Sequence, residues 1–273
     1  MPGSDRTILR ERLADIMREA GSLALTTFQG ASLKSWAKGQ SSVVTEADIA
    51  VNDLLRERLT AAAPGAAWLS EETEDAPARM AASALWIVDP IDGTRAYIAG
   101  RADWSISVAL AEQGRPSLAA IYVPASGELF LAAAGEGATL NGVPIAATPQ
   151  GHLDGATIAG PQRYLQWITR ANPKTVAVPK VHSLALRLAR VAQGAIDAAF
   201  TAGNSHDWDL AAADLLVHEA GGTLTDFMGR ALNYNRADPV HGALLAAGQA
   251  RHATLIGLLR DRQDEQDEIA KQV

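Results

Sequence analysis

Residues 85–94 carry the densest chemistry in this sequence. Their first four residues are apolar, which predicts a buried strand, and the strand ends in Asp89 and Asp92 with Pro90 between them. Two carboxylates held this close repel each other unless a cation lies between them. Ligands that are all oxygen favour a hard ion, so the pair points to Mg²⁺ before Zn²⁺.

The residues after this acid pair have the chemistry to handle a phosphate. Gly93 allows a ligand to approach the backbone closely, and Thr94 opens a short helical stretch over residues 95–99. Free N–H groups at a helix start bind phosphate oxygens. The acid spacing alone would favour an Asp-rich surface turn, but the strand before it and the Gly-Thr after it reverse that preference and favour a site.

Three further acids lie at the predicted ends of strands or helices. Glu71 follows a short strand at residues 67–69, and Asp48 and Asp209 each lie at the start of a predicted helix. Taken singly, Asp48 and Asp209 are explained as well by helix capping, and Glu71 by a solvated turn. Function is favoured because all three lie at element ends, on the rim where α/β proteins form their sites.

Composition narrows the class of protein. The chain has 273 residues, a formal net charge of −7 and no cysteine. The negative charge argues against a partner that is polymeric nucleic acid, and the lack of cysteine excludes disulfides and thiolate sites. Residues 1–12 are charged, unlike a signal peptide, and no apolar run approaches the length of a membrane span. We therefore expect a cytoplasmic protein that does not bind membranes.

The texture of the sequence changes near residue 149. Residues 1–148 are predicted to form an N-terminal α+β domain that holds most of the acids, with two helices and an antiparallel meander of strands at residues 104–111, 118–123 and 128–133. Residues 149–273 alternate between strands and helices, which is typical of an α/β layer. This second domain supplies Asp209.

Three motifs resemble those of the inositol monophosphatase superfamily, the Mg²⁺-dependent phosphatases. The motifs are W-I-V-D-P-I-D-G-T at residues 86–94, V-T-x-x-D at residues 44–48, and W-D-x-A-A followed by E-A-G-G at residues 208–222. The resemblance covers residues 8–259. It implies an α/β (α+β) fold, a layered α-β-α-β-α sandwich of the inositol monophosphatase and sugar phosphatase type, and a homodimer.

The resemblance also implies a role for each acid. The metal ligands would be Glu71, Asp89, the carbonyl of Ile91, Asp92 and Asp209, which would hold two Mg²⁺ and a third, weaker one on Glu71. Asp48 would orient Thr94, and these two with Glu71 would activate the attacking water. Contacts to the substrate would come from Glu71, Ile91, Asp92, Gly93, Thr94, Arg95 and Asp209.

The choice of phosphate ester depends on smaller signals. Leu69-Ser70-Glu71-Glu72 and the arginine after Asp-Gly-Thr look like the bacterial CysQ-type 3'(2'),5'-bisphosphate nucleotidases, so we expect 3'-phosphoadenosine 5'-phosphate to be converted to AMP and phosphate. Arg95 and Arg236 are the candidates to meet its second phosphate. His182 stands where that pattern has glycine.

Other readings remain open. Inositol-1-phosphate is the alternative substrate, with histidinol phosphate and fructose bisphosphate as further small phosphorylated metabolites of the superfamily. A catalytically silent phosphate-binding protein is the alternative from a different class.

Overall fold

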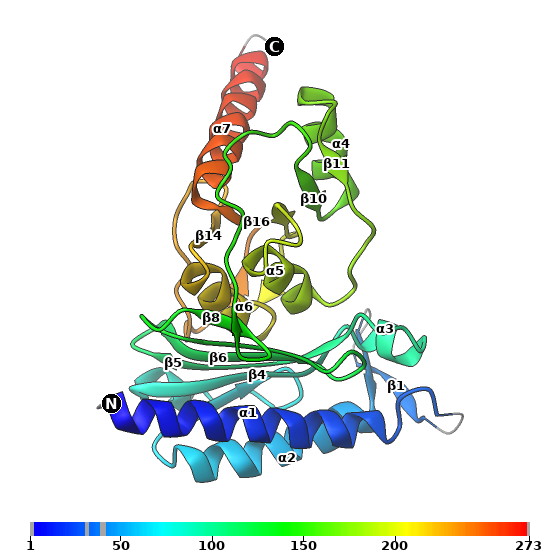
Figure 1. Ribbon diagram of the computed structural model, residues 1–273, viewed down its shortest axis with the longest axis vertical. Coiled ribbons are helices and arrows are strands. Elements are labelled where there is room, and N and C mark those ends of the chain that lie inside the picture. Colours follow the sequence, from blue (N-terminus) through cyan, green and yellow to red (C-terminus); the bar gives the residue numbers. More distant parts are fainter. Residues whose placement is uncertain (1–2, 31–32, 39–41, 272–273) are drawn as a thin grey trace.

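Helices and sheets alternate in layers in the computed structural model, which describes residues 3–30, 33–38 and 42–271. Helices cover the outer face of a seven-stranded sheet, lie between this sheet and a five-stranded one, and cover the far face of the second sheet (Figure 1). The predicted α-β-α-β-α sandwich is therefore confirmed.

The seven-stranded sheet has the order β3-β4-β5-β6-β7-β8-β9. The strands are β3 (Ala67–Ser70), β4 (Ala84–Asp92), β5 (Ser105–Glu112), β6 (Arg115–Val123), β7 (Glu128–Ala133), β8 (Ala138–Leu140) and β9 (Val143–Pro144). All neighbours pair antiparallel except β3 with β4, so the predicted meander is confirmed. In β4, Leu85 and Ile87 face one core and Trp86 and Val88 face the other, because helices cover both faces.

The five-stranded sheet has the order β11-β10-β12-β16-β14 and is mixed. Its strands are β10 (Thr157–Ala159), β11 (Val176–Ala177), β12 (Ala198–Phe200), β14 (Gly222–Asp226) and β16 (Leu244–Gly248). The predicted alternation holds for the three parallel strands, β10, β11 and β12. Sequence reasoning missed β14 and β16, which pair antiparallel, because their short apolar runs have no clear period.

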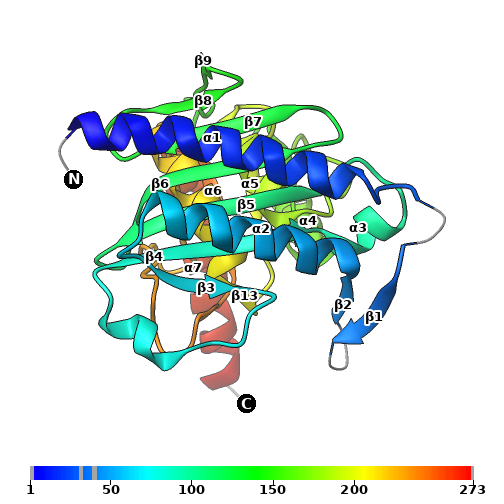
Figure 2. The same ribbon diagram turned by 90° about the horizontal axis from the view of Figure 1, so that it is seen from below.

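Helices α5 (Leu184–Ala192) and α6 (Asp207–Glu219) form the central layer and share one core with both sheets. The outer helices are α1 (Gly3–Leu25) and α2 (Glu46–Ala62) on one side and α4 (Gln162–Ala171) and α7 (Gln249–Lys271) on the other. Figure 2 shows α1 and α2 lying side by side across the first sheet. Since α5 and α6 share a core with both sheets, the packing does not separate the two halves. The division into domains 1–148 and 149–273 therefore stays a prediction.

Short elements complete the chain. They are the hairpin of β1 (Ser35–Lys38) and β2 (Ser42–Thr45), the 3₁₀ helix η1 (Pro77–Ala81), α3 (Thr94–Ile98), and the two-stranded ladder of β13 (Ser205–His206) with β15 (Val240–His241). Within the described part of the chain, no helix combines the length and apolar character that crossing a membrane requires.

Candidate active site

Three carboxylates from distant parts of the sequence meet where β4 ends and α6 begins. One oxygen each from Asp89, Asp92 and Asp209 lies within 4.8 Å of the other two. Asp89 and Asp92 are buried, whereas the Asp209 side chain is 20% exposed. The pairing of β4 with β5 shifts register between Asp89 and Asp92, where Pro90 has no N–H to donate. The irregular strand end therefore brings both of its acids to one site.

The charges at this site oppose one another. Burial, followed by the charge of Glu71 and then those of the other acids, raises the pKa of Asp89 well above its usual value. Burial and the charge of Asp92 raise the pKa of Asp209 to about 7. Carboxylates this close cannot all ionise without a cation between them. Because the donors are all carboxylate oxygens, the site fits a hard divalent cation such as Mg²⁺.

Glu71 and Ile91 lie beside this group. The backbone N–H of Glu71 donates to the Val88 carbonyl at 3.2 Å, so the parallel β3–β4 pair places Glu71 next to the end of β4. Its carboxylate is not among the oxygens within 4.8 Å, although its charge acts on Asp89. Ile91 is buried, and its N–H donates to Asp89 Oδ1 at 3.1 Å.

Thr94 and Asp48 are in direct contact. Thr94 Oγ1 donates to Asp48 Oδ1 at 3.2 Å and also lies 3.0 Å from the Ile91 carbonyl. Asp48 Oδ2 accepts from the N–H of Thr45 at 2.8 Å and from its hydroxyl at 2.6 Å, which completes a capping box on α2. Burial raises the pKa of Asp48 to about 6. One Asp48 oxygen therefore caps α2 and the other contacts Thr94, and the role of Asp48 in orienting Thr94 for catalysis stays a prediction.

The turn between β4 and α3 requires glycine at position 93. Its φ is +94°, a conformation that favours glycine, and a Cβ there would lie 3.3 Å from the N atom of Ser183. The backbone can therefore turn sharply into α3 at Thr94, with α5 close by.

Groups at the start of α5 donate hydrogen bonds to Asp92. Sequence reasoning predicted Asp92 but not these donors. The hydroxyl of Ser183 and the N–H of Ala185 both donate to Asp92 Oδ2 at 2.6 Å. Ser183 also caps α5, since its hydroxyl accepts from the N–H of Leu186. His182 points elsewhere, with its Nδ1 2.7 Å from Asp103 Oδ2. A serine at a predicted helix start was the available signal, but its partner lies 91 residues away.

Arginines near the site differ in their surroundings. Arg95 and Arg236 are exposed, and Arg236 Nη2 donates to the Val240 carbonyl at 2.6 Å. Arg187 on α5 was not predicted. In the residues that the structure describes, its buried Nε has no hydrogen-bond partner. Burial lowers the pKa of Arg187 while the charge of Asp92 opposes that change, so the guanidinium lies within electrostatic reach of the acids.

Asp209 lies in the first turn of α6. Its Oδ2 accepts from the backbone N–H of His206 at 2.6 Å, and the His206 ring stacks on Trp208 with centroids 4.5 Å apart. The helix starts at Asp207, two residues before Asp209, so the predicted position of Asp209 at a helix start is confirmed. Asp209 therefore closes the start of the helix and faces the other two acids at the same time.

Comparisons with known proteins identify the family of this chain. The sequence profile of the inositol monophosphatase family matches residues 7–264. The chain is 32% identical over 235 residues to an inositol-1-monophosphatase of Caulobacter vibrioides, covering 82% of this chain and 89% of that protein. It is 30% identical over 222 residues to the Nus factor SuhB of Escherichia coli K12, covering 78% and 82%.

A solved inositol monophosphatase from Thermotoga maritima superposes with a TM-score of 0.78 at 27% identity, covering 92% of this chain and 96% of that one. These relatives are inositol monophosphatases and SuhB, so the comparisons favour inositol phosphate, the alternative substrate, over the expected CysQ-type nucleotide. The chain belongs to the inositol monophosphatase family and is a metal-dependent hydrolase of phosphoric monoesters.

Proposed function

We propose that this protein hydrolyses inositol-1-phosphate to inositol and phosphate with Mg²⁺ bound at the acidic site. The observation that carries the proposal is the convergence of Asp89, Asp92 and Asp209 within 4.8 Å. The substrate follows from the relatives, since proteins 32% identical to this chain are named inositol monophosphatases.

The ligands proposed for two Mg²⁺ are Glu71, Asp89, the Ile91 carbonyl, Asp92 and Asp209, with Glu71 also able to hold a third ion. When bound, such ions neutralise the phosphate and lower the pKa of a bound water. Their removal from the buffer should abolish phosphate release.

Thr94 and Asp48 are proposed to handle the proton of the attacking water. The Thr94 hydroxyl is oriented by its bond to Asp48 Oδ1, at 3.2 Å, and it would accept a hydrogen bond from the water. The raised pKa of Asp48, about 6, suits a proton acceptor working near neutral pH. N–H groups at the start of α3 would hold the phosphoryl oxygens, as helix starts do elsewhere.

A bisphosphorylated nucleotide such as 3'-phosphoadenosine 5'-phosphate is the second candidate, and Arg187 favours it. A buried polar atom without a hydrogen bond is costly even where a neighbouring charge, here that of Asp92, acts on its group. The Nε of Arg187 has no hydrogen-bond partner in the described chain, so a second phosphate of a substrate would supply one. Arg95, which follows the motif and is exposed, would be a second contact.

Turnover of four esters by the full chain tests both candidates. Phosphate release would be measured from inositol-1-phosphate, 3'-phosphoadenosine 5'-phosphate, histidinol phosphate and fructose bisphosphate, each with Mg²⁺ and with EDTA. The proposal expects the highest kcat/KM for inositol-1-phosphate. A higher value for the nucleotide, together with an Arg187→Met variant that raises its KM alone, would establish the second candidate instead. No release from any ester would indicate a silent phosphate-binding protein.

Two expectations from the sequence stay predictions. Sedimentation of the full chain would test the homodimer, and fractionation of cells would test the cytoplasmic location.

A further inference from the structure

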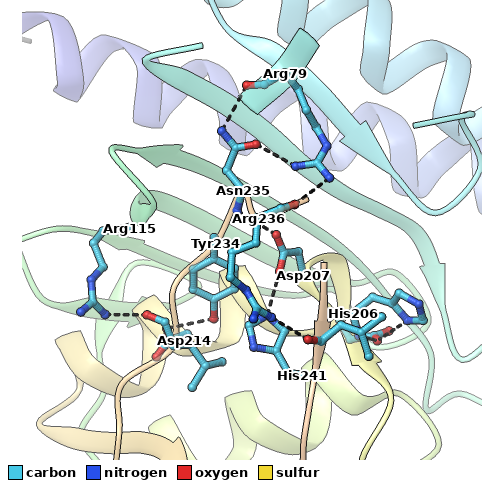
Figure 3. Close-up of polar contacts among 12 residues, drawn as sticks. Arg79, Arg115, His206, Asp207, Asp214, Tyr234, Asn235, Arg236 and His241 are labelled. Atoms are coloured by element: carbon cyan, nitrogen blue, oxygen red, sulfur yellow. Dashed lines mark hydrogen bonds and ion pairs between the residues drawn. The ribbon is translucent and has the colours of Figure 1, made fainter. Parts of the chain in front are cut away.

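A second cluster of buried polar groups lies at the start of α6, two residues along the chain from Asp209. Asp207, the first residue of α6, is fully buried, and both of its carboxylate oxygens accept hydrogen bonds. Oδ1 lies 2.7 Å from His241 Nε2, and Oδ2 accepts from the backbone N–H of Asn235 at 3.0 Å (Figure 3). The loop of residues 232–241 is therefore fastened to the first residue of the helix.

Asn235 extends this contact to the segment between β3 and β4. Its Oδ1 accepts from Arg79 Nη1 at 2.8 Å, and its Nδ2 donates to the Arg79 carbonyl at 3.1 Å, as Figure 3 shows. Arg79 lies in η1, is 3% exposed, and forms a two-bond pair with Asp75. Arg79 Nη2 also donates to the Arg236 carbonyl at 3.0 Å. We name Arg79, Asp207, Asn235 and His241 the Asp207 network.

The Asp207 network joins the two parts of the chain that supply the acids. Glu71 and Asp89 flank the segment that contains η1, whereas Asp209 lies two residues after Asp207 on α6. One carboxylate oxygen of Asp209 lies within 4.8 Å of oxygens of Asp89 and Asp92, so these like charges push Asp209 away from the other two acids. Packing fixes the position of α6 as a whole. The hydrogen bonds of Asp207 act on the first turn of α6 alone, and they can therefore set the position of the Asp209 carboxylate.

We infer that the Asp207 network positions Asp209 for metal binding, with Arg79 and Asn235 as the positioning residues that tie the η1 segment to the start of α6. Outer contacts that orient a metal ligand contribute about 10- to 100-fold to metal affinity. The inference rests on the proposed Mg²⁺ site and goes beyond it, because none of these four side chains is a proposed ligand.

Asn235→Gly is the sharpest variant. Asn235 has a φ of +61°, which glycine adopts without strain, and the backbone N–H that donates to Asp207 is retained. Among the residues that the structure describes, the side-chain bonds lost are the two to Arg79. Asn233→Gly is the matched control, since Asn233 is an exposed asparagine of the same loop outside the network. Arg79→Lys, which keeps the charge but not the planar fork, is the second variant.

Each metal-free, full-length variant would be titrated calorimetrically with Mg²⁺, and its thermal unfolding and ester kinetics would be recorded. We expect Asn235→Gly and Arg79→Lys to weaken Mg²⁺ binding about tenfold. Activity should recover at high Mg²⁺ with an unchanged KM for the ester, and Asn233→Gly should bind Mg²⁺ like the parent.

The outcomes separate the inference from the proposed function. A parent chain that binds no Mg²⁺ would overturn the proposed function. A parent that binds Mg²⁺, with variants that bind it equally well and only unfold at a lower temperature, would overturn the inference alone. If Asn235→Gly does not fold, Arg79→Lys decides by the same criterion.

Discussion

Asp207 of the Asp207 network and Asp209 of the acidic site lie two residues apart in the first turn of α6. In the network, Asp207 has hydrogen-bond donors on both oxygens and the buried Arg79 close enough to feel its charge. At the site, Asp89 is surrounded by the charges of Glu71, Asp92 and Asp209, all of the same sign. The chain completes the first cluster with its own side chains and leaves the second to be completed by an external cation.

This difference shows which buried charges serve the fold and which serve the site. A buried carboxylate with its partners in place stabilises one arrangement of the chain, whereas carboxylates that repel one another lower stability until something binds them. The start of α6 carries one carboxylate of each kind. The predictions that follow remove one element of this contrast at a time.

Asp89→Asn should have the largest effect. Asp89 lies at the centre of the acids, and losing its charge should lower kcat/KM by about 10³-fold, the scale of the electrostatic contribution of one preorganised group. The fall in kcat/KM is measured as phosphate release from inositol-1-phosphate over a range of Mg²⁺ concentrations. Asp53→Asn, an exposed carboxylate on α2, is the control and should behave like the parent. Mg²⁺-dependent turnover near the parent rate in Asp89→Asn would refute the site.

Asp48→Asn should lower kcat by about 10²-fold, the usual contribution of a positioned proton acceptor. The amide keeps one accepting oxygen in place of two, so it can serve Thr94 or Thr45 but not both, and it no longer accepts a proton. No proposed metal ligand is changed, so Mg²⁺ binding should be unchanged. Calorimetry with Mg²⁺ alongside the kinetics separates the two effects. A fall in Mg²⁺ affinity that accounts for the whole loss would show that Asp48 acts on the metal site and not on the proton.

The pH dependence should differ with and without Mg²⁺. In the metal-free fold the pKa of Asp209 is about 7, compared with an ordinary value of 3.8. The folded chain therefore holds protons between about pH 4 and pH 7 that the unfolded chain releases, and its stability should fall as pH rises through that window. Mg²⁺ replaces those protons, so it should bind more tightly as pH rises.

Thermal unfolding at several pH values, with EDTA and with Mg²⁺, measures this contrast. The Tm with EDTA should be lower at pH 7.5 than at pH 5, and the increase in Tm on adding Mg²⁺ should be larger at pH 7.5. An EDTA series in which Tm rises steadily over this range would mean that the acids are not buried together as described.

The sequence predicted the acids but not the side chains around them, because the acids lie at the ends of elements and the other side chains depend on distant contacts. Asp89, Asp92 and Asp209 lie at element ends that local signals mark, so their convergence could be expected from the chain alone. Ser183, Arg187 and Asn235 act through partners far away in sequence, such as the contact of Ser183 with Asp92 across 91 residues. These contacts depend on how α5 and α6 pack against the first sheet, which periodicity does not reveal.

The fold shows the same limit. The long strand β4 and the meander after it were predictable because runs and turns alternate clearly. The antiparallel strands β14 and β16 were not, and the loop between them carries Asn235, so the Asp207 network could not be anticipated. Residues 232–236 were instead interpreted through Arg236 as a contact to substrate, and the structure places that guanidinium on the Val240 carbonyl.

Ser183→Ala should have the smallest effect and tests how far the support of Asp92 matters. The hydroxyl both caps α5 and donates to Asp92 Oδ2 at 2.6 Å, so its loss should reduce the free energy of unfolding by about 1 kcal/mol. Asp92 keeps the N–H of Ala185 as a donor, and we therefore expect Mg²⁺ affinity to fall by no more than about tenfold. Ser183→Thr keeps a hydroxyl and should restore both quantities, as denaturant unfolding and calorimetry would report. A variant that loses stability but binds Mg²⁺ like the parent would limit Ser183 to its role as a helix cap, and would leave α5 outside the support of the metal site.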